Sequence, residues 1–237
     1  MKIMYEINSI ELLREQQYDF IKRLKDDSLL NCQTAGTNSE ITVVSDLSTI
    51  RKIGNFSLSM FNKYKNPYEK ISSKENIEII EKNFIGKLGE EAVKSRLDQL
   101  VTEVDYTIKK YGDNKVDFKL IFDSSIGGIQ VKTRNDIYDT VKWSISKKEI
   151  EENTFLVCML IEKKVTLKEI LASVKEISQN NENKEYEYKI ISAGFLPIDL
   201  IKKECKKQFT IHDLLYSSGL NAYLNKLMEL KIAELLK

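Results

Sequence analysis

Three polar residues in two neighbouring segments, Asp117, Gln130 and Lys132, have the types and spacing needed for metal-assisted chemistry on a phosphodiester. If residues 127–134 form a strand, its period of two puts Gln130 and Lys132 on one face. Residues 116–122 alternate in the same way, and Asp117 opens their polar face. Carboxylate and amide oxygens bind hard divalent ions, and a fixed ammonium group stabilises charge that develops at a phosphate. We therefore expect these three side chains to lie close together.

A predicted helix over residues 84–97 supplies a further carboxylate. Its apolar positions form one stripe, and Gly86 and Gly89 would allow another element to approach closely. Glu90 lies at the edge of this stripe, whereas Glu91 points further towards solvent. Glu90 is therefore the preferred candidate for a site.

The other elements must position these residues. The uninterrupted apolar run over residues 154–161 is typical of a central buried strand. Ser146 is expected to cap a brief helix through Glu149 to Glu152. Helices are also predicted over residues 8–30, 47–64, 74–82 and 166–178 and in the tail from Thr210, and strands over 41–44, 103–110, 115–123, 127–134, 143–146 and 186–193.

This order predicts an α/β fold with a mixed central β-sheet flanked by helices. Residues 1–80 would form a mainly helical N-terminal extension, and residues 81–237 one domain that ends in a C-terminal helix.

Composition limits the classes of protein. The 237 residues are 42% apolar and 31% charged, which favours a folded chain, and no apolar run approaches the roughly 20 residues that span a bilayer. The N-terminus does not resemble a signal peptide. Three widely spaced cysteines, Cys32, Cys158 and Cys205, favour a reducing cytoplasm. Because the net charge is +1, a nucleic-acid surface would have to be a local patch.

The run Gly86-Lys-Leu-Gly-Glu90, followed by Asp117 and then by Gln130-Val-Lys132, resembles the PD-(D/E)XK nuclease superfamily. The likeness is greatest to the branch of Mrr-type restriction enzymes and Holliday-junction-resolvase-like proteins, and it covers roughly residues 80–200. It implies a restriction-endonuclease-like fold and a metal-dependent endonuclease that hydrolyses DNA, in restriction, phage defence or mobile-element processing.

The resemblance also assigns roles to residues. Asp117 would be the central metal ligand, Gln130 would take the position of the second ligand, and Lys132 that of the catalytic lysine. Glu90 would be the carboxylate on the helix, and the backbone carbonyl of Val131 would complete the shell of a Mg²⁺ ion, for which Mn²⁺ would substitute.

The chain departs from the family pattern at two positions. Val116 stands where a proline usually precedes the aspartate, and Gln130 where a carboxylate usually precedes the lysine by two residues. A neutral amide lowers the negative charge of the site, which makes Glu90 more important. Two alternatives follow: a catalytically weak or inactive nuclease-fold subunit that binds DNA or assembles, and an exposed cross-strand ion pair between Asp117 and Lys132.

Basic and aromatic residues follow the candidate site along the chain. They are candidates for phosphate contacts and, in the case of the tryptophan, for stacking on a base: Arg134, Lys142, Trp143, Lys147 and Lys148. The alternative is a core tryptophan beside a solvated face. A homodimer would present two copies of one site to the two strands of DNA.

Overall fold

The computed structural model describes residues 7–31, 39–64, 74–108, 116–123, 127–161, 163–178 and 186–235. Its helices are α1 (Ile7–Lys25), α2 (Leu47–Tyr64), α3 (Lys74–Leu97), α4 (Lys147–Glu152), α5 (Leu167–Ser178), α6 (Ile198–Glu204) and α7 (Gly219–Leu235). Its strands are β1 (Ile41–Val44), β2 (Phe118–Lys119), β3 (Gly128–Arg134), β4 (Trp143–Ser144), β5 (Asn153–Leu160), β6 (Tyr188–Pro197) and β7 (Gln208–Phe209).

Five of these strands form one mixed sheet in the order β1-β6-β5-β3-β2. β3 runs parallel to β5, and the other neighbours are antiparallel. From Phe155 to Leu160 every residue of β5 is buried, which confirms the prediction of a central strand. The register places Gln130 opposite Leu156 and Lys132 opposite Cys158. The sheet therefore holds the candidate residues of β3 against its central strand, β5.

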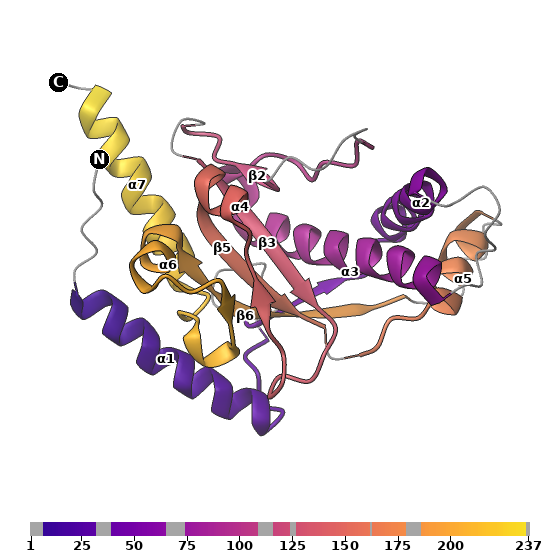
Figure 1. Ribbon diagram of the computed structural model, residues 1–237, viewed down its shortest axis with the longest axis horizontal. Helices are drawn as coiled ribbons and strands as arrows, with labels where there is room; N and C mark the ends of the chain where they lie inside the picture. The colour runs from indigo at the N-terminus through magenta and orange to yellow at the C-terminus, as the bar shows by residue number, and fades with distance from the viewer. Residues whose placement is uncertain are drawn as a thin grey trace.

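Helices cover the sheet, and the predicted class of a mixed sheet flanked by helices is confirmed. α3 packs against β3, and α2 and α5 pack beside it, while α6 packs against β5 and β6 (Figure 1). The rings of Phe155 and Phe195 on the sheet meet Tyr223 of α7. In the part of the chain that the structure describes, no helix is long and apolar enough to cross a membrane.

Within the first 80 residues, the described elements α1, β1 and α2 pack against the rest of the chain. β1 forms the edge of the sheet beside β6, and α2 packs against α3 and α5. On α1, the Gln17 side chain donates to the carbonyl oxygens of Ala193 and Ile211, at 2.8 and 3.0 Å. The boundary predicted at residue 80 lies inside α3.

Several elements differ from the sequence prediction. The strand predicted over residues 103–110 is absent over 103–108, and 109–110 lie outside the described residues. There the Asp105 carboxylate accepts from the backbone N–H and hydroxyl of Thr107, a local turn that competes with strand pairing. The tail forms only a short turn at Ile211–Asp213 before α7, and α6 was not predicted.

The two glycines of α3 differ in what surrounds them. A Cβ atom on Gly89 would overlap with the Thr133 side chain of β3, whereas one on Gly86 would meet nothing within 4 Å. Gly89 is therefore the position where helix and sheet approach closely, as predicted, and Gly86 is not.

We expect Gly89→Ala to lower the free energy of unfolding by about 1–3 kcal/mol, because the added methyl group forces α3 and β3 apart. The matched control Gly86→Ala should be neutral or stabilising by about 0.5–1 kcal/mol, since alanine favours the helix. Urea unfolding of both variants measures the difference. Equal stability of the two variants would contradict the close approach.

Candidate metal site

Asp117 lies immediately before β2 and is held over β3 by backbone and side-chain hydrogen bonds. Its N–H donates to the carbonyl oxygen of Ile129 at 3.1 Å. Its Oδ2 accepts from the N–H of Val131 at 2.7 Å and from Nε2 of Gln130 at 2.5 Å. Burial raises the pKa of Asp117, while the Val131 N–H and the charges of Lys87 and Lys132 act to lower it. The predicted proximity of Asp117 and Gln130 is therefore present.

The amide of Gln130 provides the test of whether these residues fit a metal ion. Gln130 is buried, and its Nε2 lies between two oxygens, Oδ2 of Asp117 at 2.5 Å and the carbonyl oxygen of Val131 at 3.3 Å. Its Oε1 is buried and has no hydrogen-bond partner among the described residues. If the amide turned over, Oε1 would face the same two oxygens, an arrangement that a cation between them would stabilise. The oxygens are of the type that Mg²⁺ and Mn²⁺ prefer, so the donor set fits.

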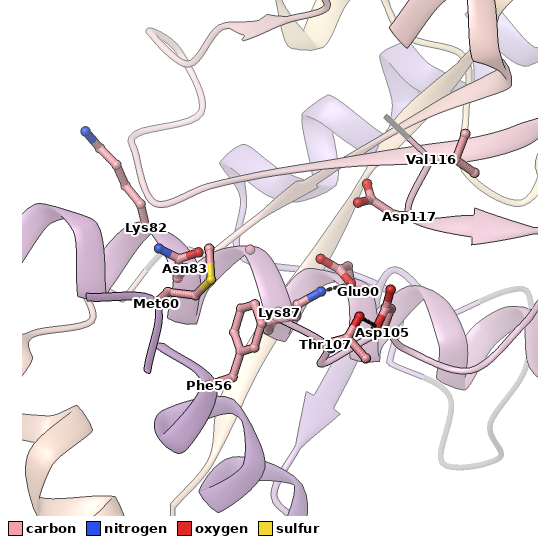
Figure 2. A pocket seen from close by; sticks show the side chains of 11 residues that line it. Phe56, Met60, Lys82, Asn83, Lys87, Glu90, Asp105, Thr107, Val116 and Asp117 are labelled. Atoms are coloured by element: carbon pink, nitrogen blue, oxygen red, sulfur yellow. Dashed lines mark hydrogen bonds and ion pairs between the residues drawn. The ribbon is translucent and has the colours of Figure 1, made fainter. Parts of the chain in front are cut away.

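Glu90 of α3 and Asp117 both border one cavity of about 200 Å³ (Figure 2). The Glu90 side chain is 11% exposed, and its Oε2 lies 2.6 Å from Nζ of Lys87, one turn earlier on the same helix. Burial and the charge of Asp117 raise the pKa of Glu90, and Lys87 opposes them. Two carboxylates thus share a poorly solvated space, and an added cation would stabilise their ionised forms.

The cavity does not bring all the candidate residues together. Its other lining residues are Phe56, Met60, Lys82, Asn83, Gly86, Lys87, Asp105, Thr107 and Val116. Gln130 and Lys132 are not among them. Asp117 is the residue that joins the two groups, because it borders the cavity and bonds Gln130 and Val131 directly. The neighbouring Glu91 accepts from the Tyr106 hydroxyl at 2.6 Å and does not line the cavity, in agreement with the preference for Glu90.

Lys87 is a cation of this site that the sequence prediction did not single out. Its Nζ lies over the ring of Phe56 at 5.0 Å and near that of Tyr106 at 5.7 Å. Such faces attract an ammonium group and hold it beside Glu90. The spacing of three residues between Lys87 and Glu90 on a helix was the available signal.

Lys132 is paired with a residue that was predicted only as part of a short helix. Its Nζ lies 2.6 Å from Oε1 of Glu149. The alternative of an exposed Asp117–Lys132 ion pair is not what forms, because the ammonium group of Lys132 pairs with Glu149 instead. Lys132 still acts on Asp117 through its charge.

Trp143 requires a correction among the predicted nucleic-acid contacts. It is fully buried, and its Nε1–H donates to the carbonyl oxygen of Met159 at 3.3 Å, so its ring has no surface on which a base could stack. The core alternative describes this residue. Lys142, Lys147 and Lys148 are exposed, and the partly buried Arg134 donates from Nε to the carbonyl oxygen of Lys142 at 3.3 Å. For these four, phosphate contact stays a prediction.

Among the described residues, no three His, Cys, Asp or Glu side chains come together as a metal-binding group. A metal ion here would depend on the Gln130 amide and the Val131 carbonyl as well as on the two carboxylates. Comparison with family models, with curated proteins and with solved structures gave no match. The case for a function therefore depends on the geometry of this site.

Proposed function

We propose that the protein is a metal-dependent endonuclease that hydrolyses phosphodiester bonds of DNA, with a restriction-endonuclease-like arrangement of its sheet and helices. The main support is the position of Asp117. This carboxylate borders the cavity with Glu90 and accepts hydrogen bonds from Gln130 and Val131, and the charge of Lys132 acts to lower its pKa.

The residues that would hold Mg²⁺ are Asp117, Glu90, Gln130 through Oε1 and Val131 through its carbonyl oxygen. When bound, a divalent ion supplies Lewis acidity towards a phosphate oxygen and lowers the pKa of water. The observation that favours this set is the buried Oε1 of Gln130, for which the described part of the chain offers no hydrogen-bond partner.

The protein groups contribute positioning and charge. The Val131 N–H fixes the orientation of the Asp117 carboxylate, and the β3 backbone fixes Val131. Lys132 carries a positive charge that stabilises negative charge developing on the phosphate during in-line attack by water. The exposed Lys142, Lys147 and Lys148 would contact phosphates on either side of the scissile bond. Restriction, phage defence or mobile-element processing in the cytoplasm, by a homodimer, would suit such an enzyme.

A second candidate is a nuclease-fold subunit that binds DNA without cutting it. One observation favours it: Nε2 of Gln130 donates to Oδ2 of Asp117 at 2.5 Å, so the amide can take the place of a cation beside this carboxylate. In such a subunit the amide would replace the cation permanently.

Incubation of the purified protein with supercoiled plasmid tests the proposal. We expect nicked or linear DNA with Mg²⁺ or Mn²⁺ and none with a chelator, and a calorimetric titration with Mn²⁺ should show binding. Linear product formed early would indicate two sites acting together. DNA binding without cleavage and without Mn²⁺ binding would replace the proposal by the second candidate.

A further inference from the structure

The two oxygens of the Glu149 carboxylate have different partners. Oε1 lies 2.6 Å from Nζ of Lys132, and Oε2 accepts from the backbone N–H of Ser146 at 2.6 Å. Glu149 is buried, with its side chain 11% exposed, and the Lys132 side chain is 21% exposed. The ion pair is therefore largely shielded from water, where such a contact is stronger than on a surface.

Local structure holds this carboxylate in place. Ser146 and Glu149 form a reciprocal capping box at the start of α4, since the Ser146 hydroxyl accepts from the Glu149 N–H at 3.3 Å while Glu149 accepts from Ser146. At the other end of the helix, the Asn153 side chain donates to the Glu149 carbonyl at 2.8 Å, and β5 begins at Asn153. The carboxylate thus has little freedom to follow Lys132, whereas the lysine has four rotatable bonds.

We propose that Glu149 is a positioning residue for the reaction, which holds the ammonium group of Lys132 on β3 in one position. This role depends on the proposed nuclease function. A lysine without such a partner would sample many rotamers, and each turnover would have to select one of them. The ion pair with Glu149 holds Lys132 in one rotamer before the substrate binds, and the capping box of α4 fixes Glu149.

Glu149→Gln separates the two roles of the side chain. Glutamine also forms a capping box, so the bond to the Ser146 N–H is retained while the charge facing Lys132 is lost. We expect kcat for plasmid cleavage to fall about 10- to 100-fold, with little change in KM, in the Mn²⁺ dissociation constant or in the unfolding midpoint. Glu152→Gln, an exposed position of the same helix, is the matched control and should match the wild type.

A double-mutant cycle with Lys132→Met tests whether Glu149 acts through the lysine. We expect the double variant to cleave at the rate of Lys132→Met alone, because Glu149 then has nothing to position. A Glu149→Gln protein as fast as or faster than the wild type would overturn the inference, and so would losses that multiply in the double variant. Failure of the proposed function has a different signature, since the wild type itself would not cleave.

Discussion

Asp117→Asn is expected to abolish metal-dependent cleavage, with a loss on the order of 10³-fold in kcat, and to remove Mn²⁺ binding from a calorimetric titration. The substitution preserves shape, and an asparagine oxygen can still accept from the Val131 N–H that Asp117 Oδ2 now binds at 2.7 Å. The fold should therefore persist. The substitution removes the negative charge of a residue that borders the cavity and is hydrogen-bonded to β3.

The matched control is Asp105→Asn. Asp105 lines the same cavity, but its Oδ1 accepts from the backbone N–H and hydroxyl of Thr107, at 2.8 and 2.6 Å. We expect this variant to bind Mn²⁺ and to cleave DNA like the wild type. Full activity of Asp117→Asn would refute the site. Loss of activity in Asp105→Asn alone would indicate that the metal binds at Asp105 instead of Asp117.

The elements that position this site were predictable because their patterns are local. Alternation over residues 127–134 indicated β3, and the apolar run over 154–161 indicated the buried β5. The cap at Ser146 was also predicted and is confirmed, since a serine three residues before a glutamate is a signal within one turn. α6, a helix of seven residues, is too short to show a reliable period, and it was missed.

Contacts between elements could not be read in the same way. Glu149 was predictable as a cap residue, yet its second oxygen meets Lys132, 17 residues earlier in the chain and on another element. The sequence around Trp143 is the same whether the ring stacks on a base or fills the core. Its complete burial in the fold shows that it is a core residue. Lys87 was overlooked because its aromatic neighbour Phe56 comes from α2. A periodic pattern specifies a face but not what that face meets.

The metal-free protein should lose stability as the pH rises, and Glu90→Gln should remove most of this loss. The pKa of Glu90 is raised from 4.5 to about 8, chiefly by burial and then by the charge of Asp117. Between these values the folded state binds more protons than the unfolded state, so the free energy of unfolding falls with rising pH. Below 4.5 the effect vanishes because Glu90 is protonated in both states. In chelator, we expect Glu90→Gln to match the wild type at pH 4.5 and to exceed it on the order of 2 kcal/mol at pH 8.5.

Urea unfolding across this pH range measures the difference, and Glu78→Gln on the same helix is a control of opposite sign. Lys82 lowers the pKa of the exposed Glu78, so its charge favours the folded state and its removal should cost a little stability above pH 4.5. A Glu90→Gln curve parallel to that of the wild type would mean that burial does not raise the pKa of Glu90.

A bound divalent ion would offset the cost of burying the ionised Glu90 carboxylate. Mn²⁺ should accordingly stabilise the wild type more at pH 8 than at pH 6, and Glu90→Gln less than the wild type at both.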